Sequence, residues 1–203
     1  MKLTKKEIST SKFLSLVLRH KPEIIGIHLD SAGWVSIPEL IAGMNAYGKD
    51  ITNLELMELV IKETRYTIDK FTNKIRANHG HSIPGINLGL EDRVPPFVLY
   101  HGTCERSAND IIKDGEIKRM KRNSVHLSDN YDKALNIGKR HGKPRVYRIE
   151  AGQMWRDGFV FYKSDDGVWL TGCVPGKYIY LLPENVTSTD LKVWISTNTE
   201  WLG

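Results

Sequence analysis

The chain has 203 residues, a formal net charge of +5 at pH 7 and the apolar and charged content of an ordinary globular protein. This length can bury the core of one large domain or of two smaller ones, and no Pro- or Gly-dominated tract points to a fibrous or disordered class. No apolar run is long enough to span a membrane, and the basic start lacks the apolar region and cleavage pattern of a signal peptide. The two cysteines, Cys104 and Cys173, show no zinc-type spacing. We therefore expect a cytoplasmic protein with no bound metal and no membrane partner.

The N-terminal half predicts three helices followed by a β-hairpin. Capping boxes, in which Thr or Ser precedes Glu by three residues, begin at Thr4, Ser36 and Thr52. The first helix should end near Arg19 and His20, because Pro22 disfavours a helical conformation in the residue before it. The β-rich stretches Arg65–Phe71 and Lys74–Asn78 flank Thr72-Asn73 and predict a hairpin. This order of elements is that of a winged-helix module.

A second domain is predicted after an irregular segment from Ile83 to Pro96 that is rich in Pro and Gly. We place the boundary so that the domains span residues 1–92 and 93–203. Beyond it, Asp165-Asp166-Gly167 is a turn signal, and short strands predominate over two helices, Glu105–Lys113 and Asn130–Lys139. The predicted strands are Phe97–Tyr100, Val125–Leu127, Val146–Ile149, Phe159–Tyr162, Val168–Leu170 and Tyr178–Leu182. The fold class expected for the whole chain is α+β.

The positive charge is concentrated in two segments. Residues 1–25 contain six Lys or Arg against two acids, and residues 116–148 contain ten against three. Two basic segments can form one groove that binds nucleic acid, but such runs are more often solvated faces. Charge alone leaves both interpretations open.

Three arginines and one histidine are candidates for a phosphate site. Arg19 and His20 end the first predicted helix, Arg76 lies in the second hairpin strand, and Arg122 precedes the strand Val125–Leu127. Guanidinium groups from separate segments bind a phosphate dianion through paired, charge-assisted hydrogen bonds. Taken singly, Arg19 and His20 can instead stabilise a helix C-terminus, and the other two can be solvated surface. The phosphate hypothesis therefore requires all four side chains to converge.

A polar face is predicted near the start of the second domain. His101-Gly102-Thr103 follows the strand Phe97–Tyr100, and Gly102 would allow a ligand to approach the backbone closely. Strand alternation places His126 and Ser128 on one face, opposite Val125 and Leu127. A turn at the end of a strand explains the first motif equally well. No nucleophile elbow, Walker A loop or dinucleotide-type glycine motif is present in the sequence.

Taken together and in order, five motifs resemble those of the RNA 2′-phosphotransferase family, from about Phe13 to Tyr180. The motifs are Leu18–Pro22, Leu29–Val35, Ile75–Ser82, Tyr100–Thr103 and Arg122–Ser128. The resemblance implies a winged-helix-like RNA lobe, then a strand-rich ADP-ribosyltransferase-like lobe that holds NAD, with the active site in the cleft between them. Ser124 and His79 depart from the family pattern, which usually has histidine and glutamine at these places.

The resemblance also implies the reaction and its residues. The 2′-monophosphate of an RNA, such as a tRNA splice junction, would be transferred to ADP-ribose, which releases nicotinamide and ADP-ribose 1″,2″-cyclic phosphate. NAD would be consumed as a co-substrate, without a metal, by a monomeric enzyme. The implied catalytic residues are Arg19, His20, Arg76 and Arg122, and the implied NAD-binding residues are His101, Gly102, Thr103, His126 and Ser128.

Two other functions remain open at this stage. An ADP-ribosyltransferase of the same fold could cap a terminal phosphate of a nucleic acid and stop after the first step. A winged-helix nucleic-acid binder without catalysis could use the same basic residues.

Overall fold

The computed structural model describes residues 3–191, which form two compact units. The first contains the chain up to Asp92 together with two later segments, Arg119–Ser124 and Tyr162–Val168, and the second contains the remainder. The sequence placed Arg122 with the C-terminal half, whereas its segment belongs to the first unit. The reason is that the backbone N–H and the side-chain amide of Asn123 donate hydrogen bonds to carbonyls of residues 81–86.

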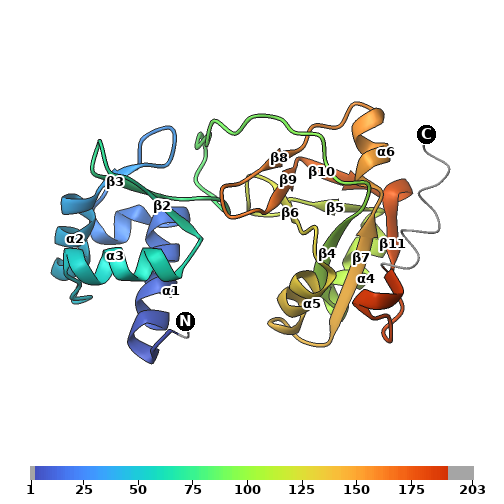
Figure 1. Cartoon of the computed structure of the whole chain (residues 1–203), viewed down its shortest axis with the longest axis horizontal. Coiled ribbons are helices and arrows are strands. Elements are labelled where there is room, and N and C mark those ends of the chain that lie inside the picture. The colour runs from blue at the N-terminus through green and yellow to red at the C-terminus, as the bar shows by residue number, and fades with distance from the viewer. Residues whose placement is uncertain (1–2, 192–203) are drawn as a thin grey trace. The chain divides into compact units, whose positions relative to one another are not determined.

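The first unit contains three α-helices and a three-stranded antiparallel sheet of strand order β1-β3-β2 (Figure 1). Its elements are α1 (Lys5–Arg19), the 3-10 helix η1 (Pro22–Ile25), β1 (Val35–Ser36), α2 (Ile37–Ala46), α3 (Asn53–Lys62), β2 (Tyr66–Asp69), β3 (Lys74–Ala77) and β8 (Tyr162–Lys163).

Local sequence signals explain where the helices of the first unit begin. At Thr4 and Thr52 both hydrogen bonds of a capping box form, as predicted. At Ser36 the hydroxyl accepts from the Glu39 backbone N–H, while a Glu39 carboxylate oxygen accepts from the backbone N–H of His28 at 3.4 Å. The predicted end of α1 is confirmed, because His20 is its C-cap. The apolar faces of these helices meet β3 in one core, in which Leu14, Leu18, Leu40, Leu56 and Ile75 are fully buried.

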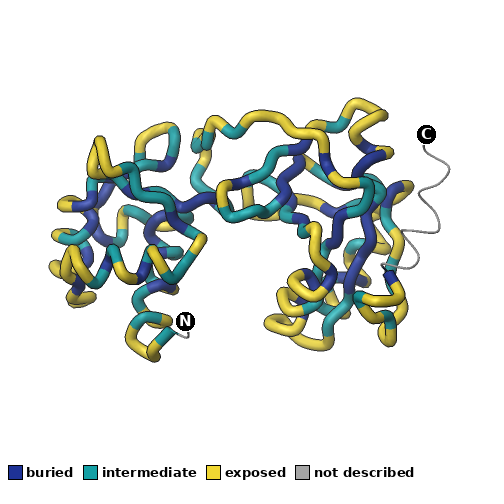
Figure 2. Tube along the Cα trace, viewed as in Figure 1, coloured by how far each residue is buried: buried dark blue, intermediate teal, exposed yellow. Residues whose placement is uncertain are grey.

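The predicted hairpin is also confirmed. Strands β2 and β3 pair antiparallel, with Thr67 opposite Arg76 and Asp69 opposite Lys74. The loop between them spans residues 70–73, and Figure 2 shows it as exposed. Ile75 and Ala77 are buried and Arg76 lies on the opposite face, so the hairpin presents this arginine outside the core.

The second unit is strand-rich and contains three antiparallel sets of strands. Strand order is β11-β7-β4 in the first, β10 pairs with β5 and β6 pairs with β9. Its elements are β4 (Leu99–Cys104), α4 (Glu105–Asp114), β5 (Glu116–Lys118), β6 (Val125–Leu127), α5 (Tyr131–Lys139), β7 (Pro144–Ile149), α6 (Ala151–Arg156), β9 (Trp169–Thr171), β10 (Cys173–Pro175), the 3-10 helix η2 (Gly176–Tyr178) and β11 (Ile179–Leu181). With its helices and small antiparallel sheets, the chain is of the α+β class.

Several predicted elements of this unit are shifted or absent. His101-Gly102-Thr103 lies inside β4 rather than after a strand, and the predicted strand Phe159–Tyr162 is replaced by the short β8 that starts at Tyr162. Phe161 is fully buried, so its apolar character reflects core packing without strand pairing. Within residues 3–191, no helix has both the length and the apolar character needed to cross a membrane.

Candidate active site

Arg19, at the last position of α1, presents a partly buried guanidinium with unsatisfied donors. Its Nε and Nη2 atoms are buried and have no hydrogen-bond partner among the described residues. Gly80 lies beside this side chain, since a Cβ there would be in van der Waals contact with Nη1 at 3.4 Å, and its φ of +88° favours glycine. Buried donors without partners are costly, so a protein that retains them presents them to a ligand or to solvent.

His20 follows Arg19 in the chain. It is held by Ser82, which lies two residues after Gly80. Its Nδ1 forms a hydrogen bond with the Ser82 hydroxyl at 2.9 Å, and the Ser82 backbone N–H donates to the Arg19 carbonyl at 2.9 Å. Partial burial, followed by the charges of Arg19 and Arg122, lowers the pKa of His20. The ring is therefore more readily neutral near pH 7 than an ordinary histidine.

Arg76 on β3 is positioned by three groups from different segments. Its guanidinium carbon lies 4.6 Å from the centre of the Trp34 ring, and Nη1 donates to the Leu88 carbonyl at 3.0 Å. Nη2 lies 3.7 Å from a carboxylate oxygen of Asp165, while the buried Nε has no hydrogen-bond partner within the described chain. Stacking on the indole and a planar fork of donors restrict the orientation of the side chain.

Arg122 is brought to the first unit by hydrogen bonds of the residue that follows it. The Asn123 backbone N–H donates to the His81 carbonyl at 2.9 Å, and its side-chain amide donates to the carbonyls of Ile83 and Ile86. Desolvation lowers the pKa of Arg122 even though the residue as a whole is exposed. Its charge in turn contributes to the lowered pKa of Arg19 and of His20.

Two further histidines complete this cluster. His81 is 2 % exposed, and its Nε2 has no hydrogen-bond partner among the residues that the structure describes. Burial, with the charges of Arg19, His79, His20 and Arg76, lowers its pKa to about 4. His79 instead pairs with a carboxylate, since its Nε2 lies 3.0 Å from an Asp166 oxygen. His81 is therefore neutral at pH 7 and adds no charge to the cluster.

The four predicted catalytic residues thus belong to one unit and share one electrostatic environment. The charge of Arg122 lowers the pKa of Arg19, and both arginines lower that of His20. Arg19, His20 and Arg76 all lower the pKa of His81. Three arginines against the carboxylates of Asp165 and Asp166 leave a cationic site with buried donors, which suits a dianion. A phosphate is the ligand that this chemistry favours.

The residues predicted for the nucleotide side lie in the second unit. His101 and His126 are linked, because His101 Nδ1 is 3.1 Å from the His126 carbonyl oxygen. Backbone hydrogen bonds join Ser128 to Tyr100 in both directions, at 2.7 and 2.9 Å. Val125 and Leu127 are buried and His126 is only partly so, which agrees with the predicted alternation.

Gly102 has a different role from the one expected. A Cβ at this position would lie 1.7 Å from the Ala134 carbonyl oxygen, so helix α5 occupies the space that was expected to admit a ligand. Gly102 alternates with His101 and Thr103 along β4, so these two side chains point to the other face of the strand. Thr103 itself is largely buried.

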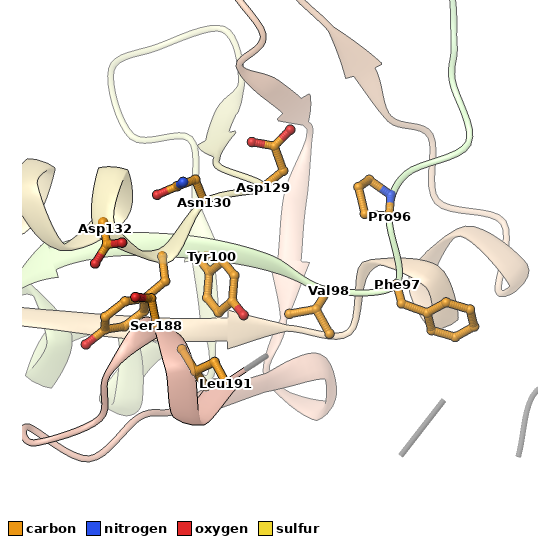
Figure 3. Close-up of a pocket in the computed structure, with 10 residues that line it drawn as sticks. Pro96, Phe97, Val98, Tyr100, Asp129, Asn130, Asp132, Ser188 and Leu191 are labelled. Atoms are coloured by element: carbon orange, nitrogen blue, oxygen red, sulfur yellow. The ribbon is translucent and has the colours of Figure 1, made fainter. Parts of the chain in front are cut away.

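A pocket of about 310 Å³ lies on the second unit (Figure 3). The apolar side chains of Val98, Tyr100 and Leu191 lie together there, with Asp129 and Asn130 beside them. Among the described residues that line it, none is a predicted site residue, and Tyr100 alternates with His101 along β4. We therefore assign no part of the predicted site to this pocket. Within residues 3–191, no group of three or more His, Cys, Asp or Glu side chains could hold a metal ion.

The sequence reasoning missed the residues that orient the arginines. Trp34 belongs to a motif that was noted without a role, and Asp165-Asp166-Gly167 was interpreted only as a turn. Asp165 and Asp166 lie near Arg76 and His79 although about 87 residues separate them from these partners in the chain. The unusual density of polar residues in that turn was the only available signal.

Comparisons of this chain with a family model and with known proteins all point to the same family. A model of the RNA 2′-phosphotransferase, Tpt1 / KptA family matches residues 5–172. A protein of Rhodopirellula baltica named probable RNA 2′-phosphotransferase is 45% identical over 182 residues, which cover 88% of this chain and 98% of that protein. Proteins with the same name from Trichormus variabilis and Pseudomonas fluorescens are 40% and 43% identical, covering 87% and 89% of this chain and 97% and 100% of their own lengths.

Proposed function

Since this chain belongs to the RNA 2′-phosphotransferase family, we propose that it removes an internal 2′-monophosphate from RNA and transfers it to ADP-ribose derived from NAD. A tRNA splice junction is the kind of RNA that carries such a phosphate. In this proposal the first unit is a winged-helix-like RNA lobe, and the second is an ADP-ribosyltransferase-like lobe. The order of three helices and a hairpin supports the first assignment, and the strand-rich content of the second unit is consistent with the other.

The observation that carries the proposal is the cationic cluster of the first unit. Arg19 and Arg76 keep buried guanidinium donors without partners among the described residues, and Arg122 is tied to the same unit by Asn123. Such donors can bind the oxygens of a 2′-phosphate and stabilise the charge that develops on them. Buried donors of this kind have little use in a nucleic-acid binder without catalysis, because such a protein contacts the RNA backbone with surface side chains.

The proposed reaction has two steps. First, a 2′-phosphate oxygen attacks C1″ of the NAD ribose, and the C1″–N bond breaks to release nicotinamide. Next, the 2″-hydroxyl attacks the phosphorus, the bond to the RNA 2′-oxygen breaks, and that oxygen is protonated to give a 2′-OH. The three arginines would align the phosphate and neutralise it in both steps.

His20 is the candidate for proton transfer in the second step. Its lowered pKa makes the neutral ring available near pH 7, and its bond to Ser82 fixes the ring orientation. His101, Thr103, His126 and Ser128 are proposed to contact NAD, with His101 and His126 held together by their hydrogen bond. Gly102 is proposed to act indirectly, because the lack of a side chain there lets helix α5 pack closely against β4.

A phosphate-removal assay tests the proposal. The protein with NAD and a 2′-phosphorylated oligonucleotide should yield the 2′-OH RNA, nicotinamide and ADP-ribose 1″,2″-cyclic phosphate. Arg122→Ala should lower kcat by about 100-fold or more, the typical loss of one group that stabilises a developing charge. Lys121→Ala, at the neighbouring exposed cation, should retain activity and serves as the matched control.

Two outcomes would count against this function. A folded wild-type protein that gives none of these products at high concentration would refute it. Accumulation of ADP-ribosylated RNA, without the cyclic product, would show that the enzyme stops after the first step and caps phosphates instead.

A further inference from the structure

The loop between β2 and β3 carries an aromatic side chain with no packing role. Phe71 is fully exposed, although large apolar side chains in this unit are mostly buried. Its neighbours Lys70, Thr72 and Asn73 are exposed as well, and Figure 2 shows this loop as an exposed end of the hairpin. Exposing a whole aromatic ring forgoes the stabilisation of its burial, so the loop gains no folding stability from the ring.

The loop is held by hydrogen bonds rather than by the ring. One Asp69 carboxylate oxygen accepts from the Phe71 backbone N–H at 2.9 Å, and the other accepts from the Thr72 hydroxyl at 2.6 Å. Asn73 adopts a left-handed φ of 51°, and its carbonyl accepts from the Ile37 N–H at 3.0 Å. The backbone that bears Phe71 is therefore fixed, and the Asp69 charge is engaged within the turn.

The same hairpin leads from Phe71 to the cationic cluster. Lys74 and Arg76 alternate with the buried Ile75 and Ala77, so both point to the face of β3 that carries the predicted site. At about 3.3 Å per residue, Arg76 lies roughly 7 Å along the strand from Lys74, and the loop follows directly. Lys70 adds a further exposed cation beside Phe71.

We propose that Phe71 is a stacking platform for an unpaired base of the RNA substrate, near the nucleotide whose 2′-phosphate meets Arg76. The inference rests on the proposed function and adds a contact to it. An exposed aromatic ring next to an exposed lysine suits a single-stranded nucleic acid, because any base can stack on the ring while Lys70 approaches a backbone phosphate. An apolar protein partner would gain little from a single ring whose neighbours in the loop, Lys70, Thr72 and Asn73, are polar and exposed.

The experiment compares two 2′-phosphorylated substrates, a dinucleotide and an oligonucleotide with several unpaired nucleotides on each side. Phe71→Ala should raise KM about fivefold or more for the oligonucleotide, the lower end of the loss expected for one stacked base, and leave kcat unchanged. Both parameters should stay unchanged for the dinucleotide, which cannot reach the loop. Phe71→Tyr should restore the wild-type KM and Phe71→Leu should not.

Ile61→Ala is the matched control, because Ile61 is also an apolar residue of this unit and is 84% exposed. It should change neither substrate's KM. An unchanged oligonucleotide KM in Phe71→Ala, an equal change with both substrates, or full rescue by leucine would overturn the proposal.

A binding measurement separates this inference from the proposed reaction. Phe71→Trp should show fluorescence quenching, relative to the wild type, when an unphosphorylated single-stranded RNA of the same sequence is added. Quenching without turnover would mean that the proposed activity fails while the stacking contact stands. Turnover with neither quenching nor a change in KM would refute the stacking contact alone.

Discussion

At the scale of single residues, the predicted phosphate site includes groups that orient its arginines. Arg76 is confined by the Trp34 ring, the Leu88 carbonyl and the Asp165 carboxylate. Each of these comes from a different segment, so the guanidinium has few alternative positions. A guanidinium that is already oriented loses less entropy when it binds a phosphate.

Replacing Trp34 tests this positioning. Trp34→Leu should lower kcat for 2′-phosphate removal by about tenfold, because a cation–π contact of this kind contributes about 0.5–2 kcal/mol. Trp34→Phe should recover much of the loss, since it retains an aromatic face. Kinetic assays with thermal unfolding as a control distinguish a positioning role of Trp34 from a purely structural one. Similar losses of kcat in both variants, together with a lowered Tm, would indicate that Trp34 is purely structural.

His81 should make the folded state sensitive to acid. In the unfolded chain its pKa returns to the ordinary value near 6.5, whereas in the folded state it is about 4. Between these values the unfolded state binds more protons, so stability is full above pH 6.5 and falls as the pH drops towards 4. From pH 7 to 4.5 this histidine should account for about 2 kcal/mol of lost unfolding free energy.

Urea unfolding at several pH values measures this contribution. His81→Gln should lose less stability than the wild type over the same range, because the glutamine does not titrate. His28→Gln, at an exposed histidine, should follow the wild-type curve. If His81→Gln and the wild type fall in parallel, His81 does not remain neutral in the folded protein.

At the scale of elements, the packing of α5 on β4 determines which face of β4 remains available. Gly102 and Gly138 both lie at this contact, and a Cβ at Gly138 would be 2.5 Å from the Thr103 carbonyl oxygen. The helix therefore lies close to the strand and covers the Gly102 face. His101 and Thr103 are left on the other face.

Gly102→Ala should destabilise the second unit. The added methyl would overlap the backbone of Ala134, which cannot move without shifting α5, and overpacking of this kind costs about 1–3 kcal/mol or more. We expect calorimetry to show a Tm lower by about 5 °C. Gly172→Ala is the control, since a methyl group added there would meet no described atom within 4 Å; a comparable Tm loss in that variant would show that the Gly102 contact is not the cause.

Local signals account for the elements that the sequence predicted well. The caps at Thr4 and Thr52 are contained in four residues each, and the alternation of Val125, His126 and Leu127 needs only one strand. Among the elements that were missed, β5 depends on a distant partner, because its Ile117 pairs with Val174 of β10. Gly102 was expected to let a ligand approach the backbone, and only the fold could show that helix α5 lies against it instead.

At the scale of the whole molecule, the two sets of predicted site residues are divided between the two units. Arg19, His20, Arg76 and Arg122 are in the first, and the predicted NAD-binding residues are in the second. The sequence placed Arg122 with the second half of the chain, since chain order does not reveal that Asn123 forms hydrogen bonds with residues 81–86.

This division predicts that affinities for the two substrates can be altered separately. Arg122→Ala should impair 2′-phosphate removal while its Kd for NAD, measured by calorimetry, stays within about twofold of the wild type, because Arg122 belongs to the first unit and the proposed NAD contacts belong to the second. His101→Ala should weaken NAD binding and leave RNA affinity unchanged. A tenfold loss of NAD affinity in Arg122→Ala would contradict the separation.

The polypeptide enters the first unit three times, through its first 92 residues and then through Arg119–Ser124 and Tyr162–Val168. A chimera that exchanges residues 1–92 as a portable module would therefore leave behind Arg122, Asn123 and both aspartates of the turn at 165–166. The transplanted piece would retain Arg19, His20 and Arg76 but lose Asp165 and Asp166, the carboxylate partners of Arg76 and His79. For recombination and protein engineering, an exchange at the Pro- and Gly-rich segment after residue 83 would therefore divide the first unit, and only an exchange of the chain up to about residue 168 keeps all of its segments together.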